Sequence, residues 1–131
     1  MIILDTHALV WLTSSPDDLS SNALKEVHKW NKKGEIYVSS VSIWEIALLI
    51  RKNKLEISIG LENWLKEVEN TSSIRFVPID NKIAVDSVFL PGVFHDDPAD
   101  RIIVATARSL NAIIITKDNK IRNYKYVKTI W

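Results

Sequence analysis

The sequence contains no cysteine, which excludes disulfides and thiolate metal sites and suits a reducing compartment. It has no apolar run near the roughly 18 residues that a membrane-spanning helix needs, and its start, MIILD, lacks the basic segment of a signal peptide. No low-complexity linker and no internal repeat divides the chain. We therefore expect one domain over residues 1–131, cytoplasmic and not bound to a membrane.

Short runs, most of them apolar, alternate with helical patterns along the chain. We expect strands over residues 2–4, 36–38, 74–77, 112–116 and 126–130. We expect helices over residues 6–12, 21–32, 41–51, 61–70, 81–89 and 98–110. Apolar strands separated by helices predict an α/β fold with a parallel sheet covered on both faces. Ligands bind such sheets beyond the carboxyl ends of the strands, so functional residues should follow strands or begin helices.

The segment FHDDPADRIIVATA (94–107) places three aspartates within five positions. Asp97 followed by Pro98 is typical of a helix start, with aspartate as the N-cap and proline at the first helical position. Asp100 then falls at the third helical position, where the helix dipole favours its ionised form. It can be a second capping acid or a functional group, whereas Asp96 is interpreted as a loop residue.

Glu45 lies in the strongly apolar helical segment SVSIWEIALLI. If the helix begins at Ser42, the pattern S-x-x-E is a capping box and Glu45 is explained by structure alone. If the helix begins at Ser39 or Ser40, Glu45 lies deeper inside it, where a carboxylate needs a hydrogen bond, a cation or a metal. We favour the second interpretation.

Two more acids follow predicted strands, and each also has a local explanation. Asp5 comes directly after the first strand, where it can cap the next helix. Asp118 comes just after residues 112–116, where aspartate is a common turn residue. If the first and fourth strands are neighbours, both acids meet Glu45 and Asp100 at one edge of the sheet.

Four carboxylates at one place repel one another, so their convergence predicts a bound hard cation. Oxygen ligands suit Mg²⁺ or Mn²⁺, whereas zinc calls for histidine or cysteine, and the three histidines show no metal-binding spacing. Setting these four acids aside leaves 12 acidic residues against 17 basic ones. The basic excess is compatible with polyanion binding and equally with ordinary solvated helix faces.

Four segments carry a resemblance: LDTHALVW (4–11), SSVSIWEIAL (39–48), LPGVFHDDPADRIIVATA (90–107) and IIITKD (113–118). In their order and spacing, across nearly the whole chain, they resemble the PIN-domain nucleases, specifically the VapC-type toxins of toxin–antitoxin systems. The resemblance implies a five-stranded parallel sheet in the order 3-2-1-4-5, flanked by helices. The chain departs from the closest subgroup at Ala99, Leu49 and Asn53, which bears on substrate contacts and not on the acids.

The resemblance also implies a function and assigns the acids a role. Asp5, Glu45, Asp100 and Asp118 would be catalytic and would bind one or two Mg²⁺ or Mn²⁺ ions. The activity would be endonucleolytic cleavage of RNA by metal-activated water, inhibited by a cognate antitoxin, in a homodimer. Thr6 and Thr116 are candidates for orienting water. His7 and His95 are candidates for contacting substrate, each with a packing or surface role as its alternative. Arg101 is a candidate for a phosphate or antitoxin contact, with a solvated helix face as its alternative.

Two other functions stay open for the same residues. One is a metal-dependent phosphatase or phosphotransfer domain, for which Asp80, after the third strand, would be the acceptor and is otherwise a helix cap. The other is a non-catalytic module that binds RNA or a protein partner. Trp11, Trp44 and Trp64 are expected mainly in the core, although tryptophans near an acidic site are also frequent at interfaces.

Overall fold

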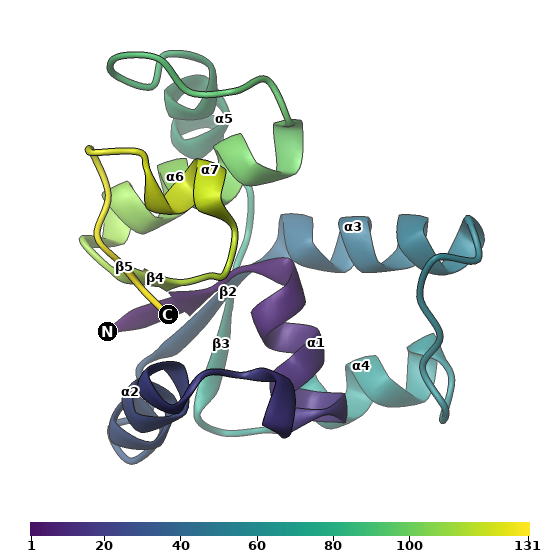
Figure 1. Cartoon of the computed structure of the whole chain (residues 1–131). Helices are drawn as coiled ribbons and strands as arrows, with labels where there is room; N and C mark the ends of the chain where they lie inside the picture. The colour runs from purple at the N-terminus through teal and green to yellow at the C-terminus, as the bar shows by residue number, and fades with distance from the viewer.

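A parallel five-stranded sheet forms the centre of the computed structural model, which describes residues 1–131 (Figure 1). Its strands are β1 (Ile2–Leu4), β2 (Ile36–Ser39), β3 (Ile74–Val77), β4 (Ile113–Ile115) and β5 (Thr129–Ile130). They lie in the order β3-β2-β1-β4-β5, and every neighbouring pair is parallel. The predicted α/β class and strand order are confirmed.

The first strand of the chain is the central strand of the sheet. In β1, Ile3 pairs with Tyr37 of β2 on one side and with Ile114 of β4 on the other. All three residues of β1 are fully buried. The strand order reverses at β1, and this switch point is where open α/β sheets bind their ligands.

Helices cover both faces of the sheet (Figure 1). They are α1 (Thr6–Ser14), α2 (Ser21–Asn31), α3 (Ser40–Arg51), α4 (Leu61–Glu69), α5 (Asn81–Val88), α6 (Pro98–Leu110) and α7 (Asn119–Arg122), with a 3₁₀ turn η1 (Pro16–Asp18). Because side chains alternate along a strand, Ile2 and Leu4 join the core beneath α1, α2 and α4. Ile3 faces the second core, with α6 and α7.

Three details differ from the sequence-based expectations. The segment after β4, interpreted as a turn, forms the short helix α7, and the fifth strand is shorter than predicted, Thr129–Ile130. Trp44 was expected mainly in the core, but 55% of it is exposed, because it lies on the outer side of α3. None of the helices has the length and apolar character needed to cross a membrane.

Candidate active site at the carboxyl edge of the sheet

A cavity of about 510 Å³ opens beyond the carboxyl ends of β1 and β4. Its lining comes from the β1–α1 junction, α1, α3, the loop before α6, α6 itself, the β4–α7 connection and α7. The lining residues are Asp5, Thr6, His7, Trp11, Glu45, His95, Asp97, Asp100, Lys117, Asp118 and Lys120. All four acids singled out from the sequence therefore share one cavity, and Asp97 adds a fifth carboxylate to it.

Asp5 is both a helix cap and a cavity residue. Its Oδ1 accepts a hydrogen bond of 2.8 Å from the Ala8 N–H, which fixes the start of α1, and the residue is only 6% exposed. Burial raises the pKa of the Asp5 carboxyl, and Asp118 raises it further, whereas hydrogen bonds from Thr116 and Ala8 and the charge of His7 lower it. The two interpretations of Asp5 are thus compatible.

Helix α3 begins at the earlier of the two possible starts. The Ser39 hydroxyl accepts a hydrogen bond of 3.2 Å from the Val41 N–H and is the N-cap. Glu45 is therefore the sixth residue of the helix, half-buried, and no capping box forms around it. Ser42 is instead buried, and its Oγ accepts a hydrogen bond of 3.1 Å from the Thr6 hydroxyl, which joins α3 to α1.

The start of α6 aims Asp100 into the cavity. Asp97 is the N-cap, as the Asp-Pro pair indicates, and its Oδ1 accepts a hydrogen bond of 2.9 Å from the Asp100 N–H. Burial raises the pKa of Asp100 to about 7, and the charges of Asp97, Asp118, Glu45 and Asp5 add to this increase. The acids are therefore close enough to repel one another.

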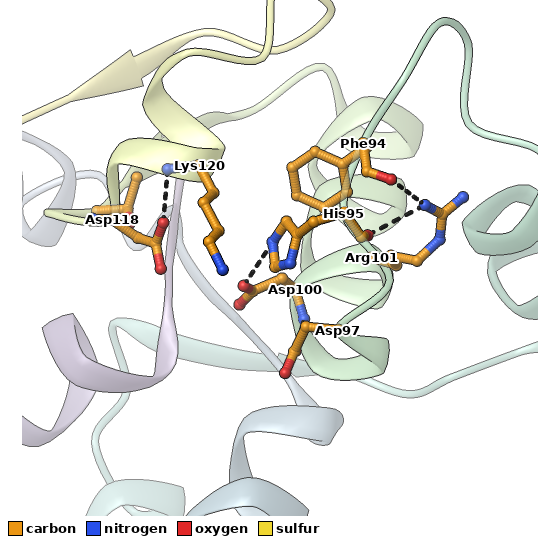
Figure 2. A network of polar contacts seen from close by, with 8 residues as sticks. Phe94, His95, Asp97, Asp100, Arg101, Asp118 and Lys120 are labelled. Carbon is orange, nitrogen blue, oxygen red and sulfur yellow. Dashed lines mark hydrogen bonds and ion pairs between the residues drawn. The ribbon is translucent and has the colours of Figure 1, made fainter.

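His95 stands directly beside Asp100 (Figure 2). Its Nε2 lies 2.9 Å from Asp100 Oδ2, but it is not aligned for a hydrogen bond. The His95 ring also packs on Phe94, at 4.5 Å between ring centroids. His95 was a candidate for a substrate contact, but the sequence did not indicate its contact with Asp100, because this partner lies on the helix that follows the loop.

The β4–α7 connection contributes Asp118 to the cavity, and Thr116 supports it from behind. The Asp118 N–H donates a hydrogen bond of 3.0 Å to the Thr116 hydroxyl, and Asp118 Oδ1 accepts one of 2.7 Å from the Lys120 N–H, which caps α7. Lys117 and Lys120 also line the cavity. The sequence did not indicate either lysine as a site residue, because both entered only the overall count of basic residues.

Arg101 lies outside the cavity, contrary to the expectation of a substrate contact. Its Nε donates to the Ser87 carbonyl at 2.8 Å and its Nη2 to the Val88 carbonyl at 3.0 Å. Its Nη1 donates to the carbonyls of Phe94 and His95, at 2.9 and 3.2 Å (Figure 2). Since all its nitrogens are engaged by backbone carbonyls, Arg101 fastens the loop between α5 and α6 and holds His95 in position.

The chemistry of the cavity fits a hard divalent cation. Its donors are mostly carboxylate oxygens, and the repulsion expressed in the raised pKa of Asp100 is what such a cation relieves. The acids share the cavity without converging on one point, and no three acidic or histidine side chains are placed to hold an ion together. The residues that would hold such an ion are Asp5, Glu45, Asp100 and Asp118.

Comparisons with known proteins place this arrangement in context. The family model of the PIN domain matches residues 2–126. The chain is similar to ribonuclease VapC22 of Mycobacterium tuberculosis, with 30% identity over 132 residues, 99% of this chain and 98% of that protein. Among solved structures, VapBC2 of Rickettsia felis bound to promoter DNA has a TM-score of 0.72 at 16% identity, covering 99% of this chain and 98% of that one. A toxin–antitoxin complex of Klebsiella pneumoniae has a TM-score of 0.66 at 19% identity, covering 97% and 95%.

Proposed function

The chain belongs to the PIN-domain family, and on that premise we propose that it is a VapC-type toxin that cleaves RNA endonucleolytically with Mg²⁺ or Mn²⁺. The observation that carries the proposal is the cavity at the switch point, where Asp5, Glu45, Asp100 and Asp118 meet from four different elements. Such a cluster is costly to fold, since burial and mutual repulsion disfavour the charged acids.

The chain's own residues would hold the ion and organise the site around it. The four carboxylates would bind one or two ions, and a bound ion supplies positive charge to the scissile phosphate and lowers the pKa of water. Thr116 holds Asp118 through its hydroxyl and favours the ionised form of Asp5. Thr6 joins α1 to α3 and so places Asp5 relative to Glu45. We therefore assign both threonines to positioning of the acids rather than of water.

The two alternative functions have less support. A phosphotransfer domain would use Asp80, but this residue caps α5 by accepting a hydrogen bond of 2.8 Å from the Ile83 N–H, and it does not line the cavity. A non-catalytic binding module would have no physical reason to keep repelling acids in a buried site. Metal-dependent RNA hydrolysis gives the four acids a role, since a bound cation relieves their repulsion.

The test is digestion of total RNA by the purified protein with Mg²⁺ and, in parallel, with a chelator. We expect discrete fragments with 5′-phosphate and 3′-hydroxyl ends in Mg²⁺, and none in chelator, because the acids alone offer no positive charge to the phosphate. A phosphomonoester run alongside should stay intact. Cutting that persists in chelator would contradict the metal-dependent mechanism, and release of phosphate from the monoester would favour the phosphatase.

We also propose an antitoxin partner and a cytoplasmic site of action. The solved relatives include a toxin–antitoxin complex, and an acidic cavity suits a basic side chain of an inhibitor. The inhibitor would then occupy the place of the cation, and its binding would weaken as Mg²⁺ rises.

We propose that the chain forms a homodimer through the outer face of α5. This face and the loop after it present Val85, Val88, Phe89 and Val93 to solvent, with Phe89 79% and Val93 96% exposed. On the same helix, Lys82 and Asp86 form an ion pair, so this face contains one positive and one negative charge. Two copies related by a twofold axis would therefore bring apolar residues together and set each lysine near the other copy's aspartate.

Phe89→Glu should convert a dimer into a monomer, because the new carboxylates would be buried opposite each other. Ile59→Glu is the matched control: Ile59 is 43% exposed in the connection between α3 and α4, away from this face. Size-exclusion chromatography with light scattering measures the mass. A wild-type protein that is monomeric, or a Phe89→Glu variant that stays dimeric, rules out this interface.

A further inference from the structure

One wall of the acidic cavity is aromatic. Trp11 is the one apolar residue that lines it, and His7, one turn earlier on α1, lies beside it. Their ring centroids are 5.6 Å apart and tilted by 45°. Trp131 packs on Trp11 in turn, at 5.5 Å, and so supports the indole.

The environment of Trp11 differs from that of the tryptophans that serve packing. The indole N–H of Trp30 donates a hydrogen bond to Glu26, and that of Trp64, which is buried, donates one to Thr13. The indole N–H of Trp11 has no such acceptor in the protein, and its ring is only partly buried. Next to it, His7 is exposed. The pair thus offers ring surface to the cavity.

Two lysines approach the same cavity from the β4–α7 side. Lys117 and Lys120 are exposed, and neither has a carboxylate within ion-pair distance despite the five acids around them. Figure 2 shows the Lys120 side chain extending from α7 into the space between Asp118 and Asp100. Their ammonium groups are therefore available to an incoming anion.

The cavity has aromatic rings on one side, lysines on another and acids between them. The rings can bind the base of a single-stranded nucleotide, and the lysines can bind its phosphates. Aromatic rings bind unpaired bases by stacking, and lysines bind the phosphates of the backbone. A base inside a duplex cannot offer its face in this way, because neighbouring base pairs cover it. The arrangement therefore favours RNA with an unpaired base at the cleavage position.

We propose that Trp11 and His7 form a stacking subsite for one unpaired base of the RNA next to the scissile phosphate. In the same complex, Lys117 and Lys120 contact the adjoining backbone phosphates. The inference rests on the proposed function, since it names how the same cavity holds its RNA. The aromatic pair and the lysines should respond differently to salt. The affinity contributed by stacking does not depend on salt, whereas the affinity contributed by phosphate contacts falls as salt rises, because these contacts release counterions.

The test is the affinity for a fluorescent single-stranded oligouridine, measured by anisotropy in chelator over a series of salt concentrations. Trp11→Leu should weaken binding about tenfold at every salt concentration and leave the salt slope unchanged, because it removes a stacking surface. Lys120→Gln should weaken binding most at low salt and reduce the slope by about 0.7, the value of one phosphate contact on a single strand.

Matched variants control for indirect effects. Trp44→Leu removes a tryptophan that is more exposed but lies outside the cavity, and it should bind like the wild type. Lys52→Gln is the corresponding lysine control, since Lys52 follows α3 outside the cavity. Because Trp11→Leu also removes packing against Trp131, His7→Ala provides a second variant whose side chain is exposed, and it should weaken binding in the same salt-independent way.

The outcomes separate this inference from the proposed function. Unchanged affinity in both Trp11→Leu and His7→Ala, an equal loss on duplex RNA of the same length, or no binding of single-stranded RNA by the wild type overturns the stacking subsite. Cleavage by the wild type in Mg²⁺ would leave the proposed function standing in each case. A wild-type protein that cleaves no RNA overturns the proposed function itself.

Discussion

Asp100→Asn is expected to lower the rate of RNA cleavage by at least about 100-fold, the range in which losses of charge-stabilising groups in active sites fall. Asparagine has nearly the same shape, so α6 and its cap are kept, but the anionic oxygen that attracts a cation is lost. The measurement is the rate of cleavage of a fixed RNA at saturating Mg²⁺.

The same substitution should stabilise the chelated protein at pH 8. Ionised Asp100 is disfavoured by burial and by the charges of Asp97, Asp118, Glu45 and Asp5, and asparagine removes that repulsion. We expect a gain of about 1 kcal/mol or more in the free energy of unfolding, measured with urea in chelator. Loss of activity together with a gain of stability separates a functional acid from a structural one.

The neighbouring aspartates are the natural controls. Asp96 is exposed and does not line the cavity, so Asp96→Asn should change neither the rate nor the stability. Asp97→Asn should preserve the helix, because asparagine caps helices as well as aspartate does. Cleavage by Asp100→Asn at the wild-type rate would contradict the role assigned to this residue, as would an equal loss in Asp96→Asn.

In chelator, the free energy of unfolding should fall as the pH rises from about 4 to about 8. The folded protein binds a proton at Asp100 with a pKa of about 7, whereas the ordinary pKa is 3.8. Between these values the folded state holds more protons than the unfolded state, so stability decreases with pH. The raised pKa of Asp5 acts in the same direction. After allowing for the partial exposure of Asp100, the decrease should be about 1–3 kcal/mol.

Mg²⁺ should reverse this trend above the pKa of Asp100. At pH 8 the ligands are ionised, and an ion that binds only the folded state stabilises it. At pH 5 Asp100 is protonated, so the same Mg²⁺ should have little effect. Urea unfolding at both pH values, with Mg²⁺ and with chelator, measures the difference. Asp100→Asn should flatten the pH dependence, and stability that rises with pH in chelator would contradict the assignment.

The features that follow local rules were predictable from the sequence. Buried apolar strands and the Asp-Pro helix start depend only on neighbouring residues. In a parallel sheet, the acids that follow the strands lie at the same edge. These rules place Asp5 and Asp118 after strands and Asp100 at a helix start, whereas Glu45 depended on where its helix begins, and the pairing of the first and fourth strands came from the family resemblance.

The features that depend on distant partners were not predictable. Arg101 reaches carbonyls up to 14 positions earlier in the chain, which no spacing on its own helix indicates. Lys120 enters the cavity because Asp118 caps a four-residue helix, whose sequence also suits a turn. Trp44 lies in an apolar segment. When nearly all residues of a helix are apolar, the sequence does not indicate which face is buried in the core and which is exposed to solvent.

The central place of β1 has a consequence for biosynthesis. β2, β3 and most of the helices lie between β1 and its neighbour β4 in the chain, so β1 is translated long before β4. The four acids are equally dispersed, and Asp118 is translated after the other three. A nascent chain therefore has no complete acidic cavity until β4 has paired with β1 and brought Asp118 into place. The proposed nuclease would therefore gain activity only after β4 has docked, which gives an inhibitor time to be present.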